Sequence, residues 1–313
     1  MSKIQDALRR LQENGEPPKP RREPTEAADV RQLPPAHSDG DVDDREPEVD
    51  VDLGELRTAG LYPPEVSERD IADQFRAIKR PLIANAYGKR VARVENGNII
   101  AVASALPGEG KTFTSINLAL SIARERDNTV LLVDADFAKP NISTVFGLNS
   151  RLGLLDIVEN GGSVHPEEAA VATDIPGLSI LPAGANRETA TELMASSSME
   201  RVVQELAHRK PGRFLIFDTP PLLHTAEASV VADLVGQVVM VVRAESTSHA
   251  ALREALAKLG DKKAINLVLN QSRSTSFAGG YGARYGSAEA YPYKREQSVQ
   301  ASATEGSLWE DAR

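Results

Sequence analysis

The chain has 313 residues, 41% of them hydrophobic, which is enough for one sizeable core with appended segments. A formal net charge of −9 argues against a dedicated nucleic-acid-binding protein, because such a protein needs a surplus of Lys and Arg to neutralise phosphates. Cysteine is absent, which excludes disulfides, thiolate catalysis and zinc–thiolate sites. No apolar run approaches the roughly 20 residues that span a bilayer, and no signal peptide pattern is present, so we expect a cytoplasmic protein.

The first 64 residues predict two segments outside the folded domain. Residues 1–14 predict an amphipathic helix, which either docks on a partner or membrane surface or packs on its own domain. Residues 15–64 are rich in proline and charge, and we expect them to form a disordered linker. The apolar positions of the helix are Ile4, Ala7, Leu8 and Leu11.

Residues 65–273 predict one domain in which strands and helices alternate. A helix is expected after Ser67, with Pro81 kinking or breaking it. The alternation is typical of an α/β fold with a parallel sheet covered by helices on both faces. The predicted strands are 99–103, 130–133, 178–181, 214–217, 238–242 and 264–269, and the further helices include 111–125, 199–208 and 250–259.

The stretch Ala105-Leu-Pro-Gly-Glu-Gly-Lys-Thr112 follows a predicted strand and opens a predicted helix, as a phosphate-binding loop does. Gly108 and Gly110 allow backbone N–H groups to curl around phosphates, and the helix N-terminus adds a favourable dipole. Lys111 is expected to neutralise phosphate charge, and Thr112 to offer its hydroxyl to Mg²⁺. The loop departs from the usual pattern at Ala105, where glycine is expected.

Three aspartates follow two further strands. Asp134 and Asp136 stand at alternate positions where strand 130–133 ends, and Asp218 follows strand 214–217. Because parallel strands end at one edge of their sheet, we expect the three carboxylates to meet the phosphate loop there. A single such residue is usually a strand terminator without chemistry, but three together with a phosphate loop favour a functional site.

A cluster of tyrosines lies in the C-terminal segment, residues 274–313, which we expect to be a flexible tail. Four of the six tyrosines of the chain fall in one stretch rich in Gly, Ser and Ala. Exposed phenols on a tail are good phosphoacceptors, although an aromatic tail without chemistry is the alternative. The four residues are Tyr281, Tyr285, Tyr291 and Tyr293.

Charged residues recur at a spacing of three in the first predicted helix of the domain. The spacing places Asp73, Arg76 and Lys79 near one helix face, which suits ion pairs between copies of the chain. A solvated charged face is the alternative interpretation.

The order of these motifs resembles the bacterial tyrosine kinase family, over about residues 65–293. The stretch 107–112 resembles its Walker A motif, 131–136 its A′ motif and 216–221 its Walker B motif. The resemblance implies a P-loop NTPase fold of the deviant Walker A type, like that of the MinD and ParA ATPases. Those relatives carry a lysine where this chain has Leu106, which separates the two groups.

The resemblance implies an ATP-dependent protein-tyrosine autokinase that uses Mg²⁺. Lys111 would stabilise the transferred phosphate, Asp136 would be the base near the tyrosine hydroxyl, and Thr112, Asp134 and Asp218 would hold the metal. Asn270 would contact adenine, with a strand-end turn as the alternative. The residues implied in nucleotide binding are Gly108, Glu109, Gly110, Lys111, Thr112, Phe113 and Asn270.

The resemblance also implies partners. Subunits would form a ring through Asp73, Arg76 and Lys79, and each tail would be phosphorylated by a neighbour. A membrane-anchored regulator of polysaccharide chain length would activate the kinase at the inner face of the cell membrane and couple it to capsule or exopolysaccharide export. Residues 76–88 and the opening helix resemble autokinases of exosortase-associated loci. The alternatives are a MinD/ParA-like ATPase switch without kinase activity and a nucleotide-binding scaffold without turnover.

Overall fold

The computed structural model describes residues 46–88, 92–160, 165–184, 190–260 and 263–272. The predicted N-terminal helix, most of the predicted linker and the four tail tyrosines lie outside these residues. Within the described part, no helix is both long enough and apolar enough to cross a membrane.

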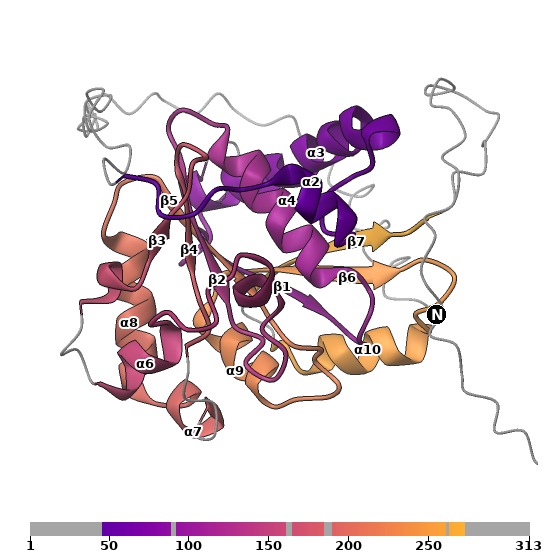
Figure 1. Cartoon of the computed structure of the whole chain (residues 1–313). Coiled ribbons are helices and arrows are strands. Elements are labelled where there is room, and N and C mark those ends of the chain that lie inside the picture. Colours follow the sequence, from indigo (N-terminus) through magenta and orange to yellow (C-terminus); the bar gives the residue numbers. More distant parts are fainter. Residues whose placement is uncertain (1–45, 89–91, 161–164, 185–189, 261–262, 273–313) are drawn as a thin grey trace, which may run out of the picture. The chain divides into compact units, whose positions relative to one another are not determined.

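A seven-stranded sheet with the order β3-β4-β2-β5-β1-β6-β7 forms the centre of the domain (Figure 1). Every neighbouring pair is parallel except β3 and β4, so the expected α/β fold with its parallel sheet is confirmed. All six predicted strands are present, and the two-residue β3 was not predicted. The strands are β1 (Ile99–Ser104), β2 (Thr129–Asp134), β3 (Val171–Ala172), β4 (Leu178–Leu181), β5 (Arg213–Asp218), β6 (Gln237–Arg243) and β7 (Ala264–Asn270).

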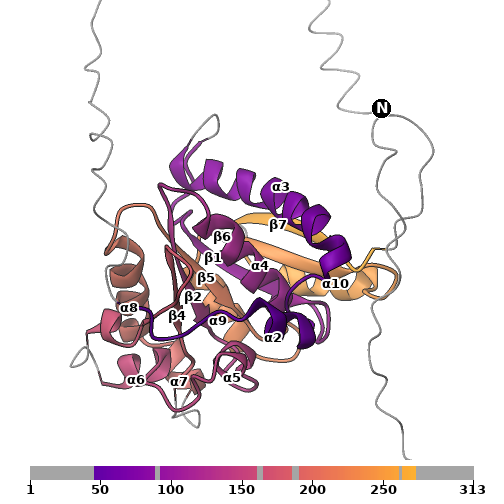
Figure 2. The same cartoon turned by 45° about the horizontal axis from the view of Figure 1, so that its top comes forward.

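Helices cover both faces of the sheet, and each face has its own core. Because alternate residues of a strand point to opposite faces, Ile100 and Val102 of β1 join one core while Ile99 and Ala101 join the other. The first core contains residues of α3 (Glu68–Tyr87) and α4 (Lys111–Ala123), and the second contains residues of the helices between 154 and 257 (Figures 1 and 2). The remaining helices are α2 (Leu53–Thr58), α5 (Asn141–Val145), α6 (Leu154–Glu159), α7 (Ala190–Met194), α8 (Ser197–His208), α9 (Glu227–Leu234) and α10 (His249–Ala257).

Helix α3 continues through Pro81 up to Tyr87, so of the two outcomes expected at this proline, a kink or a break, the break is wrong. The proline ring removes one backbone hydrogen bond, but the helix on both sides is held by packing. Phe75 before it and Leu82 after it are buried against the core that contains α4. Tertiary packing therefore outweighs the local cost.

The structure also corrects the extent of the linker, because its last part is folded onto the domain. Val51 is buried, and its backbone N–H donates to the Asp174 carboxylate at 2.8 Å. Helix α2 follows, with Asp52 as its N-cap and Leu56 buried. A few apolar residues among prolines and charges are enough to dock this segment on the domain. The average composition of the 50 residues 15–64 does not reveal them, because prolines and charges dominate it.

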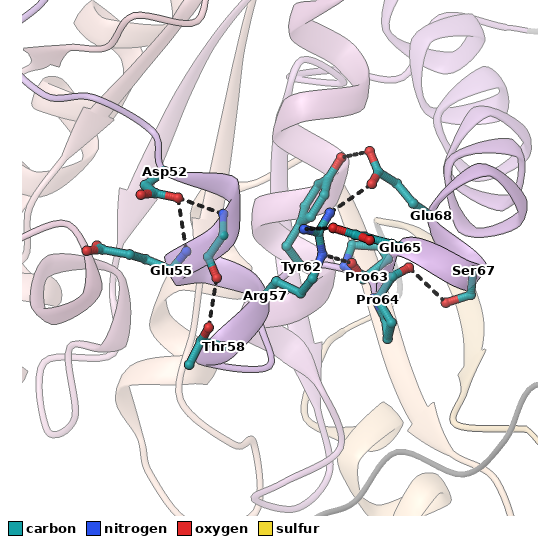
Figure 3. Close-up of polar contacts among 11 residues, drawn as sticks. Asp52, Glu55, Arg57, Thr58, Tyr62, Pro63, Pro64, Glu65, Ser67 and Glu68 are labelled. Atoms are coloured by element: carbon teal, nitrogen blue, oxygen red, sulfur yellow. Dashed lines mark hydrogen bonds and ion pairs between the residues drawn. The ribbon is translucent and has the colours of Figure 1, made fainter.

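A polar cluster fixes the turn between α2 and α3 (Figure 3). The Arg57 guanidinium donates to the Pro63 carbonyl at 2.9 Å and to Glu68 at 2.9 Å, and it lies over the ring of Tyr62. The Tyr62 hydroxyl donates to the same Glu68 carboxylate at 2.8 Å. Charge-assisted hydrogen bonds to one carboxylate thus connect α2, the turn and the start of α3.

We expect Leu56→Ala to lower the free energy of unfolding by about 2–4 kcal/mol, because it removes a fully buried side chain. Urea denaturation measures the change. Glu55→Ala on the exposed side of the same helix is the matched control and should cost far less. Equal unfolding midpoints for Leu56→Ala and the wild type would contradict the docking of α2.

Candidate nucleotide-binding site

The loop between β1 and α4 has the geometry of an anion-binding cradle. Gly108 has φ +76° and Gly110 has φ +97°, a region that L side chains rarely adopt. A Cβ at Gly110 would also clash with the side-chain amide of Asn270. Helix α4 begins at Lys111, so its N-terminal N–H groups and the glycine loop converge on one place.

Lys111 lies among carboxylates at the start of α4. Its side chain is buried, and burial lowers the pKa of the Lys111 ammonium group. The negative charges of Asp218, Asp136 and Glu109 raise the same pKa. The Lys111 ammonium group therefore lies among acids, close to the place where a polyphosphate would enter.

Asp218 at the end of β5 accepts two hydroxyl hydrogen bonds from α4. Thr112 donates at 2.8 Å and Ser115 at 2.9 Å, one to each carboxylate oxygen. Burial and the nearby Asp134 together raise the pKa of Asp218 to about 7, although hydrogen bonds from Thr112 and Ser115 and the Lys111 charge oppose the rise. A hydroxyl that donates to a carboxylate still has lone pairs free for a metal ion.

Asp134 stands directly opposite Asp218 in the register of β2 and β5. One of its oxygens accepts from both the backbone N–H and the hydroxyl of Ser143, each at 2.8 Å. Burial raises the pKa of Asp134 to about 6, while the Ser143 hydrogen bonds oppose the rise. Two buried carboxylates on neighbouring strand ends favour a cation between them, and oxygen donors are the ligands that Mg²⁺ prefers.

Asp136 is more accessible than either of these carboxylates. It lies two residues beyond the end of β2, and its side chain accepts from the backbone N–H of Lys139 at 3.0 Å. Burial raises the pKa of Asp136, and the Lys111 charge lowers it. The structure thus brings Lys111, Asp134, Asp136 and Asp218 to one edge of the sheet, as expected.

Two serines of the site were not predicted. Ser115 lies one helical turn after Lys111 on the same face of α4, so helical periodicity could have pointed to it. Ser143 lies on α5, nine residues after Asp134, and its hydroxyl also accepts from the backbone N–H of Ala183. No sequence spacing indicates the contact of Ser143 with Asp134.

Asn270 and Phe113 both contact other parts of the chain, and their expected roles in nucleotide binding stay predictions. The Asn270 amide donates to the Glu109 carbonyl at 2.9 Å, and its oxygen accepts from Gln271 N–H at 2.9 Å. The nitrogen of this amide therefore holds the phosphate loop, while its oxygen binds the backbone directly after β7. The centroid of the Phe113 ring lies 6.1 Å from that of Phe75 on α3.

The expected face of three charges on α3 holds for two of them. Asp73 and Arg76 are exposed and pair with each other at 2.6 Å. Lys79 is only 6% exposed, donates to the Ser121 carbonyl at 2.6 Å and pairs with Glu125 at 2.6 Å. Residues three apart drift by about 60° around a helix, which turns Lys79 toward α4. Its assignment to ion pairs between copies is therefore wrong.

The fold and this loop define a P-loop nucleotide-binding protein. The AAA domain family matches residues 97–269, more than half of the chain. Tyrosine-protein kinase YwqD of Bacillus subtilis is 32% identical over 204 residues, covering 64% of this chain and 80% of the relative. The crystal structure of the VpsO kinase domain shares 29% identity and a TM-score of 0.54, covering 66% of this chain and 98% of that chain. The chain belongs to the bacterial tyrosine kinase family.

Some relatives are much longer than the region that matches. The succinoglycan biosynthesis transport protein ExoP of Rhizobium meliloti is 31% identical over 180 residues, covering 56% of this chain and 22% of the relative. The chain spans 27% and 25% of two Ralstonia proteins called EpsB. The shared region is therefore the nucleotide-binding domain, and relatives differ in what surrounds it.

The raised pKa values give a pH prediction for metal binding. Folding raises the pKa values of Asp134 and Asp218 from 3.8 to about 6 and about 7, so the folded chain holds protons that the unfolded chain releases. These two groups therefore reduce stability as pH rises through those values, and a bound cation reverses the effect. We expect Mg-ADP to raise the melting temperature more at about pH 8 than at about pH 5.5. Differential scanning fluorimetry measures the melting temperature. An equal rise at both pH values would contradict the proposed effect of the two carboxylates.

Proposed function

We propose that the chain is an ATP-dependent tyrosine autokinase whose substrates include its own residues Tyr281, Tyr285, Tyr291 and Tyr293. The observation that carries the proposal is the meeting of Lys111 with three strand-end carboxylates beside a phosphate cradle. Family membership supports the reaction type, and the tail supplies the phenols.

The donor set fits Mg²⁺ with ATP. The Thr112 hydroxyl would bind the ion directly, while Asp134 and Asp218 hold it through their carboxylates or through water. When bound, the metal neutralises charge on the phosphates. Ser115 and Ser143 fix the orientations of Asp218 and Asp134, so the carboxylates are arranged before a ligand arrives.

The remaining residues act on the transferred group and its acceptor. Lys111 binds the terminal phosphate oxygens and stabilises charge that spreads over them during in-line transfer. Asp136 is the base for the tyrosine hydroxyl, because it is the most accessible of the three acids and its pKa is raised. The backbone N–H groups of residues 108–113 orient the phosphates.

Assembly and location are further parts of the proposal. Asp73 and Arg76 would contact a neighbouring subunit, and the tail would be phosphorylated in trans within a ring. The name of the relative ExoP supports a role with a membrane-anchored polysaccharide export protein. We place the kinase at the inner face of the cell membrane through that partner, where it regulates capsule or exopolysaccharide synthesis. Assignment to the exosortase-associated subgroup stays a prediction.

The decisive experiment incubates the purified chain with Mg-ATP and maps phosphotyrosine by mass spectrometry. We expect phosphate on the tail tyrosines of the wild type and at least a hundredfold less in Lys111→Met, because charge stabilisation of the transferred phosphate is lost. A variant with all four tail tyrosines changed to Phe should still bind Mg-ATP. The assay is repeated with the cytoplasmic segment of a candidate membrane activator.

ATP hydrolysis without phosphotyrosine, with and without the activator, would contradict the kinase and favour an ATPase switch. Phosphotyrosine that persists in Lys111→Met would show that it came from a contaminating kinase.

A further inference from the structure

Glu109 places a carboxylate inside the loop that is built to receive phosphates. Its side chain is only 2% exposed, and its charge acts on Lys111. The Glu109 carboxylate and a phosphate are both negative and repel each other at short distance. A carboxylate that pointed into the cradle would therefore weaken the binding of a polyphosphate. The position of the Glu109 carboxylate should therefore affect how tightly the loop binds phosphates.

Two hydrogen bonds fix the position of the Glu109 carboxylate. One oxygen accepts from the backbone N–H of Leu106 at 2.9 Å. The other accepts from the hydroxyl of Thr247, which lies in the turn between β6 and α10. Thr247 itself accepts from the backbone N–H of Arg243 at 3.0 Å, so its hydroxyl proton is directed toward the carboxylate.

A second connection joins the same segments through the backbone. The Asn270 amide at the end of β7 donates to the Glu109 carbonyl, and the Asn270 carbonyl accepts from the N–H of Ala244 at 2.9 Å. The ends of β6 and β7 are therefore tied to the phosphate loop at one residue. Of the two connections to the ends of β6 and β7, the Thr247 bond is the one that reaches the Glu109 carboxylate.

We propose that Thr247 is a positioning residue for nucleotide binding: its hydroxyl holds the Glu109 carboxylate away from the phosphate cradle and keeps that cradle receptive to a triphosphate. The inference rests on the nucleotide-binding part of the proposed function. It assigns to the β6–α10 turn a role in phosphate binding that no motif of the sequence indicates.

The test compares three single variants by titrating a fluorescent ATP analogue with Mg²⁺. Thr247→Val keeps the size of the side chain but removes the hydroxyl donor to one Glu109 oxygen, while the Leu106 N–H still binds the other, so the carboxylate can turn about that remaining bond. We expect the dissociation constant to rise about tenfold, the size of effect that one charge has near phosphates in a partly solvated site. Thr247→Ser restores the hydroxyl and should bind within about twofold of wild type. Ser246→Ala on the same turn is the control for disturbance of the turn.

A double variant separates charge from shape. In a Glu109→Gln background the carboxylate is gone, so adding Thr247→Val should change the dissociation constant by less than about twofold. The single Thr247→Val effect should also shrink in high salt, because screening weakens the repulsion. Circular dichroism checks that each variant is folded.

Two results would overturn the inference. Equal losses for Thr247→Val in both backgrounds would mean that the residue acts through loop shape alone, and wild-type binding by Thr247→Val would mean that it does not act at all. A wild-type chain that binds no nucleotide would instead overturn the proposed function.

Discussion

The site depends on two buried carboxylates that face each other across neighbouring strand ends. Asp134 and Asp218 are in register on β2 and β5, and burial holds both pKa values far above the usual range. Burying two carboxylates side by side costs free energy of folding when no cation lies between them. A ligand that brings such a cation should therefore stabilise the folded domain. Lys111 and a metal ion bound with phosphates are the partners that this arrangement favours.

The sheet order explains why these groups meet. Strand β1 lies between β5 and β6, so the phosphate loop emerges next to Asp218, with Asp134 one strand further away. On the other side, β6 and β7 end beside Glu109 through Thr247 and Asn270. The loop and the start of α4 are therefore held from both sides, by Asp218 and by the ends of β6 and β7.

Features that depend on local pattern could be predicted from the sequence. The glycines before Lys111 have the spacing of a phosphate loop, and the apolar runs that end in Asp134 and Asp218 have the length of buried strands. The alternation of strands and helices predicts a parallel sheet, which places these strand ends at one edge. Ser143 has no such spacing, because α5 is brought back to Asp134 only by the folded chain. The contact of Ser143 with Asp134 can therefore be found only from the tertiary structure.

The errors have equally particular causes. The spacing of three predicts Lys79 on one face with Asp73 and Arg76, yet its ammonium group is paired with Glu125 beside α4. Leu56 was hidden within a segment whose average composition predicts disorder, although its own burial anchors α2. In both cases the side chain is buried because of the residues it contacts in the folded domain, and composition does not reveal those contacts.

A crystal structure with Mg²⁺ and a non-hydrolysable ATP analogue tests the central claim most directly. The account predicts a metal ion bound by the Thr112 hydroxyl and held by Asp134 and Asp218, with the Lys111 ammonium group on the terminal phosphate. A triphosphate bound elsewhere, or a metal ion without contact to either carboxylate directly or through water, would contradict it.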